Sequence, residues 1–473
     1  MPKVEIPSKV KEIIETFDKA GYEIYLVGGA VRDIFMGKLV YDWDFTTDAT
    51  PEQILKLFDN AYYTNDFGMV GIPSDKEDER PYEITTFRTE YGYSDARRPD
   101  KVQWGKTLEE DLKRRDFTIN AMALQLKAAE QNTKDKGQRN SSLGFVVCTL
   151  RLIDIFDGQS DIKNKLIRAV GDPTERFSED ALRMLRALRI ASELGFRIEE
   201  NTFKAIQVNA ASITKISKER VRDEIIKILK STHPYDGILL LKNSLLMQEV
   251  LPEMEKTFGV EQKSPGRHHI YDVGTHSLFS FKYVSEKNSD PIVRLATLIH
   301  DIGKPQTYKK LDTGVITFYN HEIISAQIAK RIADRLRFSS KDKEKLYTLV
   351  RYHQFSVDER QTDSALRRFI RKVGLENIPD MLDLRIGDRL GGGARETSWR
   401  LEEFKKRLIE VQKQPFTVRD LKIDGNDVMK ILGIAPGPEV GEVLQKLFDY
   451  VVEGKIANEK EILVERLKEL KKG

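Results

Sequence analysis

The chain has 473 residues, of which 40% are hydrophobic and 32% are charged, and its formal net charge is +3. This length is enough for several domains, and the small net charge gives no overall attraction to nucleic acid, so any such surface must come from local clusters of Lys and Arg. Cys148 is the single cysteine, which excludes an internal disulfide and favours a reducing compartment. Because no apolar run approaches the ~20 residues of a membrane span, we expect a cytoplasmic protein.

The first part of the chain predicts an amphipathic helix, then a strand, a glycine turn and a second strand. The apolar run 24–27 predicts a buried strand, and Gly28 and Gly29 follow it before a further helix. Asp42 and Asp44 are predicted to lie on the second strand, where residues two apart point to the same face. Two carboxylates on one face are costly unless a cation lies between them. We therefore expect a phosphate-binding turn beside a carboxylate pair for Mg²⁺.

A capped helix and two more strands are predicted next. Thr50 is suited to cap a helix that begins at Pro51, and strands follow near 68–72 and 82–88. The second of these strands alternates between polar and apolar residues, and its Glu83 is expected to face the two aspartates.

A loop and a dense polar cluster follow. Residues 89–106 interleave aromatic and basic residues among Gly and Asp, which predicts a loop. The segment 108–124 begins as a helix and then places a dense polar cluster beside apolar residues: Arg114, Arg115, Asp116 and Asn120.

Beyond a hydrophilic insertion predicted for 127–143, the helical period takes over. The segment 176–196 predicts one helix, with Ser178 as its N-cap and Gly195 at its end. Residues spaced by three form a charged row along it: Asp180, Arg183, Arg186 and Arg189. A basic amphipathic helix is predicted for 215–229.

These residue types suit phosphoryl or nucleotidyl transfer, which needs cations held by carboxylates and donors for phosphate oxygens. The aspartate pair supplies the carboxylates, and the backbone of Gly28 and Gly29 with the following helix N-terminus supplies donors. Arg32 and Arg115 would add charge-assisted contacts. The glycine turn is not the dinucleotide fingerprint, because GGAVRD lacks the third glycine, and there is no Walker lysine.

Four motifs occur in a fixed order: VGGAVRD, DWDF, RRDFTINAMA and EDALRMLRALR. Together they resemble the class II tRNA nucleotidyltransferase and poly(A) polymerase family, within the polymerase-β-like nucleotidyltransferases. The resemblance covers residues 20–230 and returns in 422–465. It implies a template-independent enzyme that uses Mg²⁺, CTP and ATP, and that binds the acceptor arm of tRNA.

The resemblance also implies a role for each motif. The catalytic Mg²⁺ would be held by Asp42 and Asp44. The triphosphate would be bound by Gly29, Arg32 and Arg115. The sugar and nucleotide site would include Asp116 and Asn120. The incoming base would be read by Asp180 and Arg183, with Arg186 and Arg189 alongside.

The chemistry of the base edges agrees with this last role. Cytosine and adenine present an amino donor next to a ring-nitrogen acceptor, whereas uracil and guanine present a carbonyl next to an N–H. Since Asp only accepts and Arg only donates, the pair Asp180 and Arg183 matches C and A and mismatches U and G. The alternative is that the row is a solvated helix face.

Within the family, the candidates are a complete CCA-adding enzyme, a CC-adding or A-adding partner, and a poly(A) polymerase. Members that add only CC lack the flexible loop between the aspartate pair and the RRDF motif, whereas TFRTEYGYSDARRPDKVQW occupies that place here. The tail resembles tRNA-specific members. We therefore expect addition of the whole CCA sequence to tRNA 3′ ends with release of pyrophosphate.

A second group of residues suits a metal site, because His and Asp together are ligands for divalent cations. Four of them resemble the metal set of the HD phosphohydrolase superfamily: His276, His300, Asp301 and Asp388. Two more would match the extra ligands of its two-metal members: His321 and His353. If this domain is active, we expect it to cleave phosphomonoesters or cyclic phosphates; the alternative is a degenerate domain that binds tRNA or acts as a spacer.

The expected fold is α+β and mostly α, with a small mixed sheet in a nucleotidyltransferase head. The expected domains are a head (1–158), a helical neck and body (159–262), an all-α HD domain (263–395) and a helical tail (396–473). Two hypotheses of other classes are an HD phosphohydrolase with an RNA-binding head and a non-catalytic RNA-binding protein.

Overall fold

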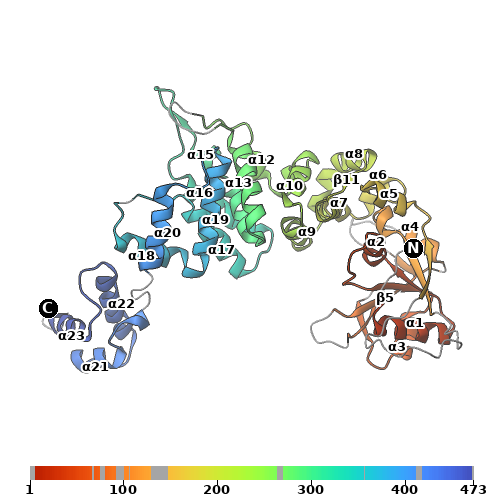
Figure 1. The fold of residues 1–473 in the computed structure, drawn as a ribbon, viewed down its shortest axis with the longest axis horizontal. Helices are drawn as coiled ribbons and strands as arrows, with labels where there is room; N and C mark the ends of the chain where they lie inside the picture. The colour runs from red at the N-terminus through yellow and green to blue at the C-terminus, as the bar shows by residue number, and fades with distance from the viewer. Residues whose placement is uncertain are drawn as a thin grey trace, which may run out of the picture. The chain divides into compact units, whose positions relative to one another are not determined.

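The computed structural model describes residues 6–65, 69–74, 80–91, 101–105, 107–128, 148–263, 270–355, 357–358, 360–411 and 418–470. The chain divides into two compact units, Met1–Pro252 and Glu253–Gly473, whose elements can be followed in Figure 1. The finer division into four domains stays a prediction. Within the described residues, no helix is both long enough and apolar enough to cross a membrane.

A seven-stranded mixed sheet organises the first part of unit 1. Its strands, in spatial order, are β3 (Tyr62–Asn65), β4 (Met69–Ile72), β5 (Tyr82–Thr86), β2 (Asp44–Thr47), β1 (Ile24–Val27), β8 (Ala123–Ala128) and β9 (Cys148–Ile153). Strands β2 and β5 run parallel, and the other neighbours run antiparallel. This sheet confirms the prediction of an α+β head.

Both faces of the sheet are covered, which explains why β1 is apolar along its whole length. Ile24 and Leu26 belong to a core that they share with helices packed on one face, whereas Tyr25 and Val27 pack with Phe87 in a smaller core on the other. The strand is therefore fixed from both sides, and the glycine turn that follows it starts from a rigid base.

Helices surround this sheet and then continue without it to the end of unit 1. They are α1 (Ser8–Ala20), α2 (Gly29–Phe35), α3 (Pro51–Leu57), α4 (Leu108–Lys113), η1 (Thr118–Asn120), α5 (Gly158–Asn164), α6 (Pro173–Glu179), α7 (Leu182–Leu194), α8 (Glu200–Asn209), η2 (Ala210–Lys215), α9 (Lys218–Lys230), α10 (Pro234–Asn243) and α11 (Leu246–Val250). The short helix α12 (Pro252–Glu255) begins at the last residue of unit 1 and belongs mostly to unit 2. A short parallel pair, β10 (Leu166–Ile167) and β11 (Arg197–Ile198), lies among them. The predicted cap at Thr50 is confirmed, because its side chain accepts from the Gln53 N–H in a capping box.

Three predictions in this unit need correction. Strand β2 begins at Asp44, so Asp42 lies before the strand and not on it. The segment 176–196 is two helices and not one, because Asp180 has extended backbone (φ −139°, ψ 103°) between α6 and α7. The predicted cap Ser178 therefore lies inside α6, whose cap is Asp172.

The predicted loop 89–106 also contains regular structure. Strands β6 (Arg88–Tyr91) and β7 (Lys101–Trp104) pair antiparallel within it, and residues 92–100 lie outside the described residues. Most of the predicted insertion 127–143 lies outside them too, between the antiparallel strands β8 and β9.

Unit 2 is almost entirely helical. Its elements are α13 (Val273–Lys287), α14 (Pro291–Ile299), α15 (Lys304–Thr307), β12 (Lys309–Lys310), β13 (Ile316–Thr317), α16 (His321–Arg335), α17 (Ser340–Tyr352), α18 (Asp363–Val373), η3 (Leu375–Asn377), α19 (Ile378–Gly391), α20 (Trp399–Val411), η4 (Val418–Asp420), α21 (Gly425–Leu432), α22 (Pro438–Val452) and α23 (Lys460–Leu470). The last three helices share a separate apolar core. Arg367 of α18 donates to the carbonyl of Val452 and ties this tail to the preceding helices.

Candidate active site

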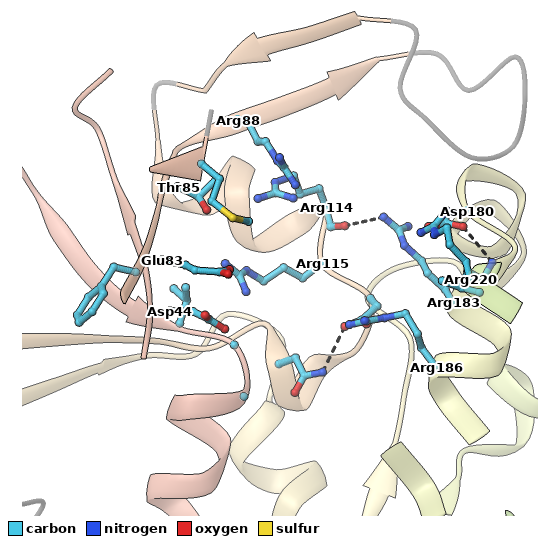
Figure 2. A pocket seen from close by; sticks show the side chains of 18 residues that line it. Asp44, Glu83, Thr85, Arg88, Arg114, Arg115, Asp180, Arg183, Arg186 and Arg220 are labelled. Carbon is cyan, nitrogen blue, oxygen red and sulfur yellow. Dashed lines mark hydrogen bonds and ion pairs between the residues drawn. The ribbon is translucent and has the colours of Figure 1, made fainter. Parts of the chain in front are cut away.

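A pocket of about 370 Å³ lies in unit 1, where the sheet meets the helices that follow it. Its lining is dominated by carboxylates and arginines, as Figure 2 shows. The lining residues are Val27, Gly28, Gly29, Asp44, Phe45, Met69, Glu83, Thr85, Arg88, Arg114, Arg115, Asp116, Asn120, Asp180, Leu182, Arg183, Arg186 and Arg220. Most of the nucleotide-binding residues predicted from the sequence are therefore brought together in one place.

Two carboxylates mark one end of the pocket. Asp44 and Glu83 are register partners on the parallel strands β2 and β5, so their side chains leave the sheet on the same face. Burial, and then the charge of Glu83, raise the pKa of Asp44 to about 6. Asp42 is not in this group, because its half-exposed carboxylate forms an ion pair with Arg80 at 2.8 Å.

The glycine turn and two arginines lie next to these carboxylates. Gly28 has φ +71°, and a Cβ at this position would lie 3.3 Å from Arg115 Nη1 and 3.7 Å from Asp44 Oδ2. Asp111, which is fully buried, accepts from Arg114 Nη2 at 2.6 Å and from Arg115 Nη2 at 3.1 Å. One buried carboxylate therefore holds two guanidinium groups at the wall of the pocket.

A chain of polar contacts crosses the floor of the pocket. Arg32 Nη1 donates to Asn120 Oδ1, and Asn120 Nδ2 donates to Asp116 Oδ1. Asp116 also forms an ion pair with Arg186 at 2.6 Å. Burial alone would raise the pKa of Asp116, but Arg186 and Arg183 outweigh it and hold this pKa at about 2. Asp116 and Asn120 therefore have a clear structural role in joining the head to α7.

The break between α6 and α7 forms the opposite end of the pocket. Asp180 Oδ1 accepts from the backbone N–H of Leu182 at 3.0 Å, so the carboxylate is held against the first residue of α7. Arg183 donates to Glu179 at the end of α6 and to the carbonyl of Arg114 just after α4, so its guanidinium is held by two separate elements. The predicted base-reading pair thus projects from a short, well-anchored corner and not from a continuous helix face.

Some predicted residues lie elsewhere, and some lining residues were missed. Arg32 lies behind the glycine turn, and Arg189 points to Glu224 and Glu193, outside the pocket. The sequence prediction did not assign Arg88 or Arg220 to the site. No local pattern distinguishes them, because each reaches the pocket only through the packing of its element.

Comparisons with known proteins agree with this geometry. Residues 24–168 match the poly A polymerase head domain, residues 195–258 match the probable RNA and SrmB-binding site of polymerase A, and residues 315–467 match the putative tRNA nucleotidyltransferase domain 2. The CCA-adding enzyme of Ligilactobacillus salivarius is 34% identical, over 98% of both chains. This chain belongs to the CCA-adding enzyme family.

Other CCA-adding enzymes are also similar to this chain in sequence or in structure. The CCA-adding enzyme of Lactiplantibacillus plantarum is 46% identical over 48% of this chain and 50% of its own length. The crystal structure of the Bacillus stearothermophilus CCA-adding enzyme in complex with CTP has a TM-score of 0.66 and 26% identity, covering 99% of this chain and 98% of that one. The Thermotoga maritima CCA-adding enzyme complexed with tRNA shares the fold, with a TM-score of 0.58 at 21% identity, covering 98% and 97%.

The second group of residues predicted from the sequence, the six His and Asp residues of a metal site, lies in unit 2. All six residues converge: His276 (α13), His300 and Asp301 (end of α14), His321 (start of α16), His353 (end of α17) and Asp388 (α19). Asp301 lies at their centre, with its oxygens 3.2–3.6 Å from Nε2 of the four histidines. The helix α14 ends at Ile299, so the adjacent His300 and Asp301 can both turn inward, as expected.

The orientation of the imidazoles in this histidine cluster (the six residues above) suits metal binding. Nδ1 of His300, His321 and His353 each lies 2.7–2.8 Å from a backbone carbonyl of its own helix end or turn. A carbonyl only accepts, so each Nδ1 carries a hydrogen and each Nε2 faces the centre. Burial lowers the pKa of His300, but Asp301 and Asp388 outweigh it and raise this pKa to about 10, so a metal ion bound here would take the place of the Nε2 proton of His300. Lys304, which the sequence prediction did not include, also contacts Asp301 at 2.6 Å.

Proposed function

We propose that this chain completes the 3′ end of tRNA by adding CCA from CTP and ATP. The observation that carries the proposal is the pocket itself, which places a carboxylate pair at one end, arginines in the middle and an Asp/Arg corner at the other. These three parts correspond to a reaction centre, a triphosphate site and a base-reading site. Similarity to the CCA-adding enzymes supports this assignment over its whole length.

Nucleotidyltransferases of this kind use a divalent metal ion, and the carboxylate end of the pocket fits one. The raised pKa of Asp44 reflects the cost of burying its charge and, after that, the repulsion from the nearby Glu83 carboxylate. A divalent cation removes this cost, and oxygen ligands are those that Mg²⁺ prefers. We therefore propose that Asp44 and Glu83 hold Mg²⁺, joined by Asp42 once it leaves Arg80. When bound, the ion supplies charge stabilisation at the phosphate and at the attacking hydroxyl.

The chain's own groups then position the reactants. Gly28 and Gly29 let the backbone approach the phosphates closely, because a side chain at Gly28 would crowd Arg115. Arg114 and Arg115, fixed by Asp111, provide charge-assisted donors for the triphosphate oxygens. The tRNA 3′-hydroxyl attacks the α-phosphate in line, and pyrophosphate leaves.

Base choice is assigned to the corner at the end of the pocket. The Asp180 carboxylate accepts from the amino group of C or A, and Arg183 donates to the neighbouring ring nitrogen. Uracil and guanine offer a carbonyl where Asp180 needs a donor, so both are rejected. Basic helices that follow the pocket would bind the acceptor arm through its phosphates, in the cytoplasm.

The deciding experiment extends tRNAs that lack CCA, CA or only A, with labelled CTP and ATP, and reads product lengths. A complete CCA-adding enzyme extends all three to the same end. An A-adding partner extends only the tRNA that lacks A, and a poly(A) polymerase adds more than one A. Failure to extend any of them would overturn the proposal.

A second function is favoured by the histidine cluster in unit 2. We propose that it binds one or two divalent metal ions and hydrolyses phosphomonoesters or cyclic phosphates. Four buried imidazoles surround Asp301, and three of them hold Nδ1 against a backbone carbonyl so that Nε2 faces the centre, which supports a metal site. The test is metal content of the purified protein beside the His300→Ala, Asp301→Ala double variant, with a phosphatase assay on both. Equal metal content would contradict the site, while tRNA extension should survive in the variant.

A further inference from the structure

A short hairpin joins α15 to α16 beside the histidine cluster. Its strands β12 and β13 pair antiparallel, with Lys310 opposite Ile316. Ile316 and Thr317 are buried, so β13 is packed inside unit 2. The Gly314 N–H donates to the Leu311 carbonyl and closes the turn at the tip. The hairpin is therefore held in place through β13, while β12 faces the solvent.

The exposed part of this hairpin combines aromatic and basic side chains. Tyr319 is 75% exposed, and Tyr308 and Leu311 are exposed as well. Both residues of β12, Lys309 and Lys310, are also exposed. Surfaces of this composition bind single-stranded RNA, because bases stack on aromatic rings and lysines attract the phosphates. A side chain as exposed as that of Tyr319 adds little to the apolar core, so its ring is available for stacking.

The hairpin is attached to the histidine cluster through Phe318. Lys304 Nζ, which contacts Asp301 at 2.6 Å, lies 5.3 Å from the centroid of the Phe318 ring. The same ring meets Tyr308 edge-on, with 5.8 Å between the two centroids. The Phe318 carbonyl accepts from Nδ1 of His321 at 2.8 Å. The aromatic residues of the hairpin therefore lie within a few side-chain contacts of the proposed metal site.

This placement suits a strand better than a single nucleotide. Tyr319 precedes His321 by two residues, so their Cα atoms are at most about 7 Å apart. If a terminal phosphate lies at the cluster, the neighbouring bases of the same strand can reach the exposed tyrosines, and its backbone can reach the lysines. Two lysines against one aspartate, Asp312, give the segment 308–319 a net positive charge. A mononucleotide has no further bases or phosphates, so it gains little from this surface.

We infer that residues 308–319 form a binding surface for single-stranded RNA, and that the histidine cluster acts on the terminal phosphate of such a strand. The inference rests on the proposed phosphohydrolase function of unit 2 and names its substrate class. The reaction consumes one water molecule. The water oxygen bonds to phosphorus, the bond from phosphorus to one ribose oxygen breaks, and that ribose oxygen takes up a proton.

The test compares two substrates with the same reactive end: a short single-stranded RNA that ends in a 2′,3′-cyclic phosphate, and a mononucleotide 2′,3′-cyclic phosphate. The ratio of their specificity constants is the readout. Stacking of one base on an aromatic ring typically changes binding about five- to hundredfold. We therefore expect wild type to prefer the RNA by at least about tenfold, and Tyr319→Ala to lower this ratio about tenfold.

Further variants separate the ring, the charges and the fold. Tyr319→Phe keeps the ring and should keep the ratio. Tyr347→Ala removes an exposed tyrosine of α17, outside the hairpin, and should also keep it. The double variant Lys309→Gln, Lys310→Gln should lower the ratio and weaken its dependence on salt. Metal content and Tm of Tyr319→Ala should equal those of wild type, which separates lost RNA binding from damage to the cluster.

The inference is overturned if wild type uses both substrates equally well, or if Tyr319→Ala keeps the wild-type ratio. Either result leaves the proposed phosphohydrolase function intact. If wild type hydrolyses neither substrate, that function fails, and the surface is then tested by photo-crosslinking a short RNA that contains 4-thiouridine to the full chain. Crosslinks within 308–319 would support the RNA surface, and crosslinks confined to the rest of the chain would overturn it.

Discussion

Asp44 provides a test of the proposal that its buried charge, next to Glu83, destabilises the folded protein unless a cation is bound. Its pKa rises from 3.8 to about 6 on folding, first through burial and then through the charge of Glu83. At about 1.4 kcal/mol for each pH unit between these values, the difference corresponds to about 3 kcal/mol. Asn has nearly the same size as Asp and no charge. In the absence of divalent metal, we therefore expect Asp44→Asn to be more stable than wild type at pH 7.5, by up to about 3 kcal/mol.

The direction of the pH dependence follows from linkage. The folded protein binds the Asp44 proton more tightly than the unfolded chain does, so raising the pH from about 4 to about 6 lowers the free energy of unfolding of wild type. Above that range the full penalty is present, and below it the penalty disappears. The advantage of Asp44→Asn should therefore be largest above pH 6 and should vanish near pH 4.

The assay is thermal unfolding of both proteins in EDTA from pH 4 to 8, following the transition of unit 1. A gain of about 3 kcal/mol corresponds to roughly 6–12 °C for a unit of this size. Asp42→Asn is the matched control: its carboxylate is half exposed and contacts Arg80, so its effect should stay within about 0.5 kcal/mol. Adding Mg²⁺ should raise the Tm of wild type and so reduce its difference in Tm from Asp44→Asn. If Asp44→Asn is no more stable than wild type, or if its added stability does not depend on pH, the Asp44 carboxylate is not the source of the destabilisation.

Three other outcomes are expected. Asp111→Asn weakens the ion pair that holds Arg115, so the KM values for CTP and ATP in tRNA extension should rise about tenfold. Unchanged KM values would show that this ion pair does not support triphosphate binding. Gly158→Ala places a Cβ against the Thr118 carbonyl oxygen, so we expect it to destabilise unit 1 by about 1–3 kcal/mol, and an unshifted Tm would contradict this packing. If phosphates dominate tRNA binding, log affinity should fall linearly with log salt, and a flat dependence in a filter-binding titration would point to another mode.

The sequence was most informative where local patterns decide the structure. The apolar run that becomes β1, the glycine turn after it and the cap at Thr50 depend on neighbours within a few residues. The convergence of His300 and Asp301 also followed from local information, because their helix ends just before them.

The errors arose where pairing between distant segments decides the outcome. The motif YDWDF does not indicate where β2 begins; that point is set by its pairing with β1 and β5, so Asp42 was wrongly placed on the strand. The contact between Asp42 and Arg80 is equally non-local. Helical periodicity runs through Asp180 without interruption in the sequence, and the break there became visible only with the backbone contact to Leu182 and the ion pair to Arg220.

The break at Asp180 also constrains how chains of this kind can change length in evolution. Each residue added within α7 before Arg186 would turn that side chain by about 100° away from Asp116 and break the ion pair that connects α7 to Asp116. Between β8 and β9, by contrast, the strands stay paired up to Ala128 and Cys148, so residues inserted beyond that pair leave the pocket unchanged. Insertions should therefore accumulate at the edge of the sheet, and the spacing from Glu179 to Arg186 should tolerate none.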